Sequence, residues 1–310
     1  MRRRQREPER TPQEETAWGL IELARHPNRP RTLDYIDHLI EDWVELHGDR
    51  RRMDDPAVIA GIGRFRGRTV AIIGTQKPKD NDAKEAAVRN YGMPSPEGYY
   101  KGMRVMTMAE RFNFPLITFI DTIGALPTKE ADERGPGGAI ARSMERMVSL
   151  RVPIVANIIG EGGSGGAIAL ALADMVLQQE NAFYNVISPE SSVPILWKEF
   201  DIKKARVLMD RHKAAMAANF LPFAQENLSR GVIDGIIPEP PEGAHNDHTA
   251  AAFLLGDTID AYLKPLEKLK TDELLKRRRK KFREMGVYKE GKSERRARTL
   301  SSILLTRNRY

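Results

Sequence analysis

Short apolar runs alternate with stretches of helical periodicity through the middle of the chain. Residues 116–121, 154–159 and 175–179 are apolar segments of strand length, and helices are expected between them at about 138–150 and 164–173. Continuous apolar strands separated by helices are typical of a parallel sheet that is covered on both faces. Right-handed crossovers place the segments that follow such strands at one edge of the sheet. The pattern therefore predicts an α/β fold whose ligand site lies at that edge.

The segments on either side of this core predict further elements. Two strands at 58–65 and 69–75 flank Arg66-Gly67-Arg68 and are expected to form a tight hairpin. Apolar side chains recur at helical spacing through 17–25 and 32–47, so each segment is expected to be a helix. The remaining expected elements are a helix at 97–113, helical stretches after Ser188 and at 203–230, a short buried strand at 231–238 and a long helix at 248–263.

Glycine-rich turns follow two of the apolar strands. Gly160-Glu161-Gly162-Gly163-Ser164-Gly165-Gly166 opens the helix after 154–159, and Asp121-Thr122-Ile123-Gly124-Ala125 follows the preceding strand. Glycine permits positive φ, and the first amides of a helix carry partial positive charge without an intrahelical acceptor. Such amides suit a phosphate, carboxylate or enolate oxygen. Because the two turns share an edge, Gly124 and Ala125 are candidates for a second donor, and two converging donors make an oxyanion hole.

The same glycines allow two alternatives. Gly160, Gly162 and Gly165 match the dinucleotide-binding pattern G-x-G-x-x-G, and Glu180 lies 20 residues on, where such folds place a ribose-binding acid. A mid-chain position and a short following helix disfavour this alternative, a nucleotide-linked oxidoreductase. Glycine in such a place often serves only close helix–strand packing, but five glycines in seven residues favour a functional site.

The turns lack an obvious catalytic base. The chain has no cysteine, and none of its six histidines lies next to either turn or in a spacing typical of metal ligands. Asp121 is expected to cap the amides of its own turn, and Glu161 is equally suited to act as a base or to form a salt bridge. A charge-stabilising site without a base suggests that the substrate or the cofactor supplies it.

Composition and charge narrow the class of protein. Apolar residues make up 41% of the 310 residues and charged residues 30%, as in ordinary globular proteins. No apolar run is long enough to span a membrane, no secretory signal is recognisable, and the lack of cysteine fits a cytoplasmic protein. The net charge of +7 is concentrated in the segment from Lys264 to Tyr310, where 17 Lys/Arg stand against 6 Asp/Glu. A series of Lys/Arg such as the one in this segment is usually the solvated face of a helix. Few aromatic residues lie between these cations, so nucleic-acid binding is not expected.

Several segments together resemble the alpha subunit of bacterial acetyl-CoA carboxylase carboxyltransferase. The resemblance covers residues 17–288 in order and is specific. It rests on Ala17-Trp18, Ala24-Arg25-His26-Pro27, Arg89-Asn90-Tyr91-Gly92-Met93-Pro94-Ser95-Pro96-Glu97-Gly98-Tyr99, Ala109-Glu110-Arg111-Phe112, Ile117-Thr118-Phe119-Ile120-Asp121-Thr122, Ile159 to Ala167, Val186-Ile187-Ser188-Pro189-Glu190, Ile195-Leu196-Trp197-Lys198 and Ile236-Ile237-Pro238-Glu239-Pro240.

The resemblance implies a crotonase-like (ClpP/crotonase) fold of repeated ββα units with N-terminal helices. It implies transfer of a carboxyl group from carboxybiotin, on the biotin carrier protein, to acetyl-CoA, with the biotin ureido group as the base. Gly165 and Gly166 would donate to the biotin carbonyl, and Gly162, Gly163 and Ser164 would line the cofactor site. The implied partners are a zinc-carrying beta subunit in an alpha2–beta2 assembly, the biotin carrier protein and biotin carboxylase, with no metal in this chain.

The sequence also departs from that family. Ile123 stands where the family usually has proline, and 126–136 and 191–194 are unusual, which leaves a divergent subunit for another acyl-CoA as an alternative. We divide the chain into a disordered N-terminal segment, 1–16, a carboxyltransferase domain, 17–262, and a basic C-terminal tail, 263–310.

Overall fold

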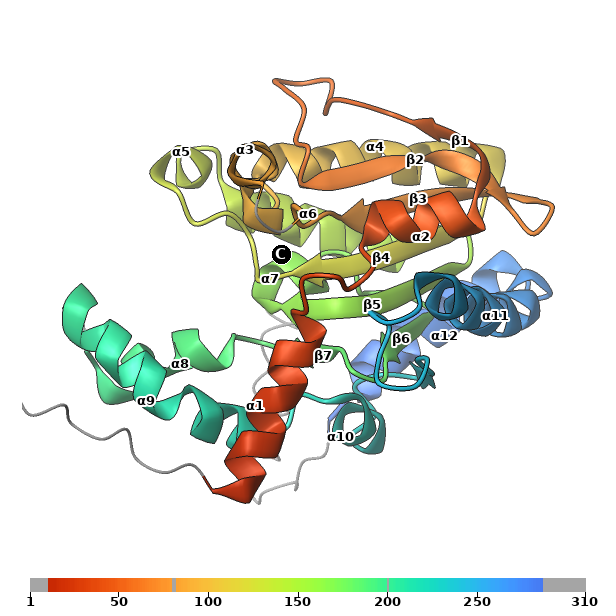
Figure 1. The fold of residues 1–310 in the computed structure, drawn as a ribbon. Coiled ribbons are helices and arrows are strands. Elements are labelled where there is room, and N and C mark those ends of the chain that lie inside the picture. The colour runs from red at the N-terminus through yellow and green to blue at the C-terminus, as the bar shows by residue number, and fades with distance from the viewer. Residues whose placement is uncertain (1–10, 80–81, 200, 287–310) are drawn as a thin grey trace, which may run out of the picture.

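The computed structural model describes residues 11–79, 82–199 and 201–286. Within those ranges, eight strands form one mixed sheet in the order β1-β2-β3-β4-β5-β6-β8, with β7 paired to β5 (Figure 1). The strands are β1 Glu41–Glu45, β2 Val58–Phe65, β3 Arg68–Thr75, β4 Leu116–Thr122, β5 Ile154–Gly163, β6 Met175–Gln179, β7 Phe183–Asn185 and β8 Gly235–Ile237. Strands β1 to β3 are antiparallel, and the sheet is parallel from β3 through β8.

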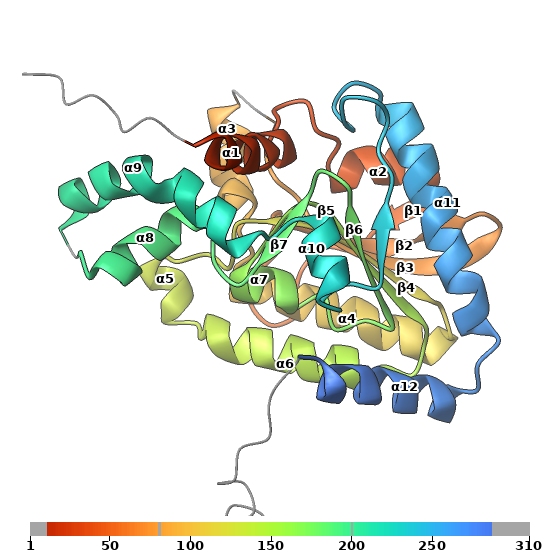
Figure 2. The same ribbon diagram turned by 90° about the horizontal axis from the view of Figure 1, so that it is seen from below.

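Helices cover both faces of this sheet. They are α1 Pro12–Ala24, α2 Thr32–Leu39, α3 Ala83–Val88, α4 Pro96–Phe112, α5 Lys129–Asp132, α6 Pro136–Ser149, α7 Ser164–Ile168, α8 Pro189–Trp197, α9 Ile202–Phe220, α10 Ala224–Ser229, α11 His248–Glu267 and α12 Thr271–Glu284, with a 3₁₀ turn at Asn90–Gly92. Helices α4 and α6 pack on one face over one apolar core, and α2 and α11 pack on the other over a second (Figures 1 and 2). The α/β architecture predicted from the alternating pattern is confirmed.

Alternation of side chains along the strands builds these two cores. In β5, Ile154, Ala156 and Ile158 point into the core under α4 and α6, whereas Val155 and Ile159 point into the core under α2 and α11. All ten residues of β5 are buried, as expected for a central strand with both faces covered. The predicted hairpin and the strands at 116–121, 154–159 and 175–179 are confirmed as β2–β3, β4, β5 and β6.

The helix predicted over 32–47 is wrong in its second half. Helix α2 ends at Leu39, and the chain continues as the edge strand β1, paired with β2. Gly61 on β2 explains the change, because a Cβ built there would lie 2.6 Å from the Trp43 ring. The missing side chain leaves room for the indole to pack on the sheet, and this tertiary contact outweighs the helical spacing.

The two ends of the described chain also differ from the sequence-based division. Helix α1 begins at Pro12, capped by Thr11 and Glu14, so residues 12–16 are helical, whereas residues 1–10 of the expected disordered segment lie outside the described residues. Helix α11 continues through Pro265 to Glu267, and α12 packs beside α6 (Figure 2). The basic segment is therefore not wholly a solvated tail, and its residues 287–310 lie outside the described residues.

Arginine 278 explains why α12 is held against the body. Its guanidinium is fully buried and pairs with Asp174 at 2.6 Å (Nη2 to Oδ2). It also donates to the backbone carbonyls of Met147, Leu150 and Val152, at and just beyond the C-terminal end of α6. Carbonyl groups at a helix C-terminus lack intrahelical donors and attract cations. One arginine of the basic run is thus a structural cap.

Candidate functional site

The two glycine turns meet at the C-terminal edge of the sheet, as predicted. Strands β4 and β5 are parallel neighbours, so the turns that follow them lie side by side. A Cβ built on Gly163 would lie 2.1 Å from the Ile123 carbonyl oxygen, and one on Gly166 would lie 2.6 Å from the Gly124 carbonyl carbon. Both positions therefore require glycine, because the two backbones are in direct contact.

Ser164 makes the sharp bend between β5 and α7. Its φ is +55°, in the left-handed region that residues other than glycine seldom adopt. Helix α7 starts there and is only five residues long, so its first amides have no intrahelical acceptor. Ser164 is exposed, Gly165 is half-buried and Gly166 is buried. The turn thus brings the amides of Ser164 and Gly165 near the molecular surface, with that of Gly166 behind them.

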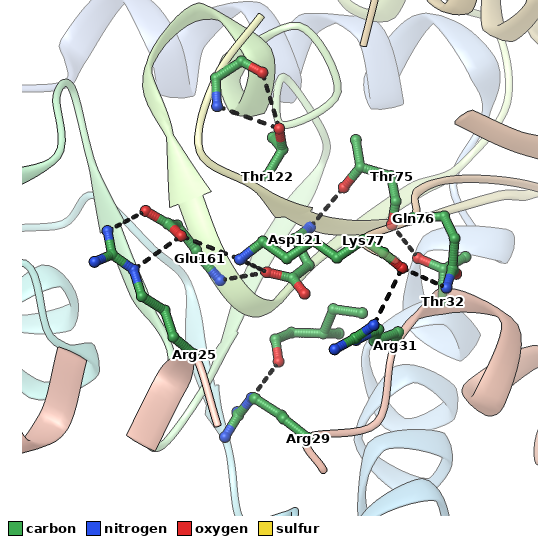
Figure 3. Close-up of polar contacts among 12 residues, drawn as sticks. Arg25, Arg29, Arg31, Thr32, Thr75, Gln76, Lys77, Asp121, Thr122 and Glu161 are labelled. Atoms are coloured by element: carbon green, nitrogen blue, oxygen red, sulfur yellow. Dashed lines mark hydrogen bonds and ion pairs between the residues drawn. The ribbon is translucent and has the colours of Figure 1, made fainter. Parts of the chain in front are cut away.

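The first turn offers fewer donors than the sequence suggested. The Gly124 amide donates to Thr122 Oγ1 at 3.2 Å, and this hydroxyl donates in turn to the Gly124 carbonyl at 2.9 Å (Figure 3). The Gly124 amide is therefore engaged within its own turn. Leu126 donates its amide to the Pro94 carbonyl. Ala125, half-buried between them, is the better of the two candidates for the second donor.

A buried charge network supports both turns from below (Figure 3). Glu161 is 1% exposed and lies between Arg25 and Lys77, at 2.6 Å from Arg25 Nη2 and 3.1 Å from Lys77 Nζ. Asp121 Oδ1 accepts from Lys77 Nζ and from the Glu161 amide, each at 2.8 Å. Arg25 also pairs with Glu190. The network therefore ties the strand ends of β4 and β5 to α1 and to the start of α8.

The network decides the roles of the two acids at this edge. Burial alone would raise the pKa of Glu161, but the charges of Lys77 and Arg25 outweigh it and lower that pKa below its usual range. Glu161 is thus an ionised partner in a salt bridge. Asp121 caps the amide of Glu161 on the neighbouring strand, and the expectation that it caps its own turn is wrong. Gly160 leaves room for it, since a Cβ there would lie 2.7 Å from Asp121 Oδ1.

A cavity of about 470 Å³ opens beside the first turn. Ile123, Glu161 and Ser188 line it on the side of the turns, and its other lining residues include His26 and Tyr91. The His26 ring contacts the His245 ring, with centroids 3.9 Å apart and planes tilted by 36°, and its Nδ1 accepts from the Asn28 amide. Among the described residues, no group of three or more His, Asp or Glu side chains is arranged to hold a metal ion.

Sequence reasoning missed Lys77 and the role of Arg25. Arg25 appeared only at the end of a predicted helix and in a family motif, and Lys77 was given no role. Neither has a periodic signal, because each meets its acidic partners through the tertiary fold. In contrast, the predicted site residues Gly162, Gly163, Ser164, Gly165 and Gly166 lie together at the end of β5 and in α7.

The dinucleotide-binding alternative loses its geometric basis. A G-x-G-x-x-G fingerprint needs its glycines in the turn between strand and helix. Here Gly160 and Gly162 lie inside β5, which runs to Gly163. Glu180, the expected ribose acid, instead accepts from the Glu239 amide. The same segment is therefore a long strand followed by an abrupt bend.

Comparison with known proteins agrees with this geometry. A family model described as "Acetyl co-enzyme A carboxylase carboxyltransferase-like" matches residues 1–286. The chain belongs to this family. The acetyl-coenzyme A carboxylase carboxyl transferase subunit alpha of Deinococcus radiodurans is 47% identical over 274 residues, 88% of this chain and 83% of the relative. That of Aquifex aeolicus is 48% identical over 273 residues, 88% of this chain and 80% of the relative. The resemblance found in the motifs is confirmed.

Solved structures of carboxyltransferases share the fold. Transcarboxylase 12S superposes with a TM-score of 0.59 at 16% identity, covering 80% of this chain and 45% of that one. The beta subunit of Pseudomonas aeruginosa geranyl-CoA carboxylase gives 0.56 at 17% identity, covering 85% and 48%. The crotonase-like fold class is thereby confirmed. No described helix is long and apolar enough to cross a membrane.

Proposed function

We propose that this chain is the alpha subunit of an acetyl-CoA carboxylase carboxyltransferase, which moves a carboxyl group from carboxybiotin on a carrier protein to acetyl-CoA and yields malonyl-CoA. The observation that carries the proposal is the backbone contact between the two turns at Gly166 and Gly124. It keeps the two turns together at one edge of the sheet, beside a cavity that Ile123 and Glu161 line, and would hold the proposed donors there. Family membership and relatives at 47–48% identity support the substrate assignment.

The residues of the second turn suit the polarisation of a carbonyl oxygen. The amides of Gly165 and Gly166 would donate to the biotin carbonyl, with Ala125 as the candidate second donor and Gly124 the weaker one because its amide is engaged. Gly162, Gly163 and Ser164 would form the wall of that site. Fixed backbone donors stabilise a developing oxyanion without reorganisation, and loss of one costs about 3–4 kcal/mol in the barrier.

The protein's acids are not arranged to take a proton at these turns. Asp121 and Glu161 are both paired with Lys77. When bound, carboxybiotin supplies the carboxyl group and, in its ureido group, a base. The side chains at this edge would then orient the donors and neutralise one another. A base supplied by the cofactor fits a site whose own carboxylates are paired with cations and whose backbone amides act as donors.

The assembly that we propose extends beyond this chain. A beta subunit would complete the site in an alpha2–beta2 tetramer and would carry the zinc, and the biotin carrier protein and biotin carboxylase would supply the carboxylated cofactor in the cytoplasm. The experiment is reconstitution of the purified chain with its beta subunit, followed by measurement of malonyl-CoA formed from carboxybiotin and acetyl-CoA. The chain alone should be inactive. An assembled pair that forms no malonyl-CoA would refute the proposal.

Substrate length is tested in the same assay. The unusual segments 126–136 and 191–194 leave a divergent subunit for another acyl-CoA as the alternative. We expect kcat/KM to be highest for acetyl-CoA and to fall for propionyl-CoA and longer thioesters. A maximum at a longer acyl chain would favour the alternative.

A further inference from the structure

Helices α8 and α9 form a hairpin that stands away from the sheet (Figures 1 and 2). We call it the α8–α9 arm, residues 186–199 and 201–213. Large apolar side chains on this arm face solvent. They are Val186, 79% exposed, Ile195, 65%, Leu196, 59%, Trp197, 45%, Ile202, 73%, and Val207, 58%. Single exposed apolar residues are ordinary on protein surfaces, but a group of six on one projecting element marks an interaction surface.

The α9 half of the arm contributes little to the core of its own chain, whereas Val193 on α8 is fully buried. The buried residues of α9 are Ala214, Met216 and Ala217, all in its last third, where the helix packs on α1. From Ile202 to Lys213 no side chain is buried. Isolated helices of this length are marginal in water, so α8 is the main support of this half of α9 within the described chain. Its apolar side chains therefore stabilise the isolated chain little.

The arm begins at the candidate site. Ser188 and Glu190, at the start of α8, line the same cavity as Ile123. Arg25 bridges Glu190 to Glu161, directly below the glycine turn. A protein seated on the arm would therefore also reach the open edge of the site. The exposed surface of the arm is therefore continuous with the candidate site, which the beta subunit is proposed to complete.

The charge of the arm indicates what kind of protein surface would bind to it. Residues 198–213 contain six Lys/Arg and three Asp/Glu, so a net positive segment, here called the basic border, adjoins the exposed apolar residues along the arm. Lys203, Lys204 and Arg206 are all exposed there. A second copy of this chain would bring the same positive border and would be repelled. A different protein with an apolar surface bordered by carboxylates is complementary.

We infer that the apolar face of the α8–α9 arm is the docking surface for the partner subunit that completes the site. This inference rests on the proposed function, because that partner is the beta subunit. To the proposed function, the inference adds the surface of this chain that the beta subunit contacts. It also states what the contacting surface of the beta subunit must be: apolar and bordered by carboxylates. The arm then positions the partner over the glycine turns through the Arg25–Glu190 link.

The test compares serine substitutions on the arm with a matched substitution elsewhere. Leu196→Ser and Ile202→Ser, alone and together, remove exposed side chains and leave the core of the chain intact. The control is Phe253→Ser, which removes a side chain that is 62% exposed on α11, on another part of the fold (Figure 1). Binding to purified beta subunit is measured by calorimetry. The double variant should weaken Kd at least tenfold, and the control should retain the wild-type Kd.

Charge gives a second, independent measurement. Lys203→Glu with Lys204→Glu should slow association with the beta subunit, and the wild-type association rate should fall as salt is added, because complementary charges steer encounter. The corresponding control is Lys129→Glu, an exposed cation on α5 outside the arm. An unchanged association rate in the arm variant would contradict the basic border as part of the interface.

The outcomes separate this inference from the proposed function. If the wild-type pair assembles but makes no malonyl-CoA, the proposed function fails. If the wild-type pair is active and the double serine variant binds as tightly as wild type, the docking surface is wrong. If that variant binds normally but sedimentation shows that it abolishes self-association of the chain, the occupant is a second copy, and the inference is also overturned.

Discussion

A single methyl group at Gly166 tests whether contact between the turns positions the donors. A Cβ built there lies 2.6, 2.8 and 2.9 Å from the carbonyl carbon, carbonyl oxygen and Cα of Gly124. Carbon atoms in contact prefer about 3.5–4.0 Å, so Gly166→Ala must push the turns apart by roughly 1 Å. All three contacts are with backbone, and no side-chain rotation relieves them.

The expected loss follows from the size of that displacement. A misplacement of about 1 Å in a catalytic site costs about 10²-fold in rate, and loss of one oxyanion donor costs about 10²–10³-fold in kcat. We therefore expect Gly166→Ala to lower kcat about 10²–10³-fold in the reconstituted enzyme. Gly165→Ala should cost at least tenfold less, because its Cβ would be crowded only by the end of the Ile140 side chain, at 3.1 Å.

The assay is malonyl-CoA formation at saturating substrates, with complex formation checked by gel filtration. Gly138→Ala on α6 is the matched control, since a Cβ there has no neighbour within 4 Å, and it should retain wild-type kcat. A Gly166→Ala enzyme that assembles and retains kcat within threefold of wild type would refute the role of the contact. Equal losses for Gly165→Ala and Gly166→Ala would refute the geometric argument as well.

Three further predictions concern the buried charges. Lys77→Met leaves two buried carboxylates without their shared cation and should lower the unfolding free energy, measured in urea, by about 3–5 kcal/mol. Adding Glu161→Gln to this variant should recover part of the lost stability. Purely additive effects of the two substitutions would contradict an interaction between Lys77 and Glu161. Because the pKa of Glu161 is lowered in the fold, its stabilisation is present above the unfolded value of about 4.3 and is lost as pH falls through the folded pKa. The difference in unfolding free energy between wild type and Glu161→Gln should therefore shrink from pH 7 to pH 3; a constant difference would argue against it. Arg278→Met should cost about 3–5 kcal/mol, whereas Arg277→Ala, exposed and paired only along its own helix, should cost under about 0.5 kcal/mol; equal urea midpoints would show that Arg278 does not hold α12.

The sheet was predictable because its central strands carry their signal locally. The apolar run at 175–179 coincides with β6, and the hairpin around Gly67 is found where the turn residues place it. The edge strand β1 was not predictable in this way. Its Trp43 and Val44 fit helical spacing, and the room for the extended segment comes from the glycines at 61 and 63 on the neighbouring strand β2.

Prediction from sequence was limited in a similar way for the basic segment. The run of six Lys/Arg at residues 276–281 predicts a solvated face from composition alone, and most of its members are indeed exposed. Arg278 differs because Asp174 and three carbonyl groups converge on its position. The sequence shows Leu274 and Leu275 at the start of the same face, but the acid that makes the burial of Arg278 favourable is 104 residues away.

The position of the glycine turns was predictable, and the charged residues beneath them were not. Glycine runs after strands report backbone geometry, which is local, whereas the link between Lys77, Asp121 and Glu161 exists only once β3, β4 and β5 are side by side. That link also makes an edge rich in carboxylates compatible with the proposed oxyanion site. Lys77 is shared by Asp121 and Glu161, and Arg25 by Glu161 and Glu190, so each carboxylate below the turns has a cation partner. This pairing would weaken the repulsion between those carboxylates and a negative charge that develops at the backbone amides. The paired acids and the open amides are therefore two parts of one electrostatic arrangement, and disruption of either should reduce carboxyl transfer.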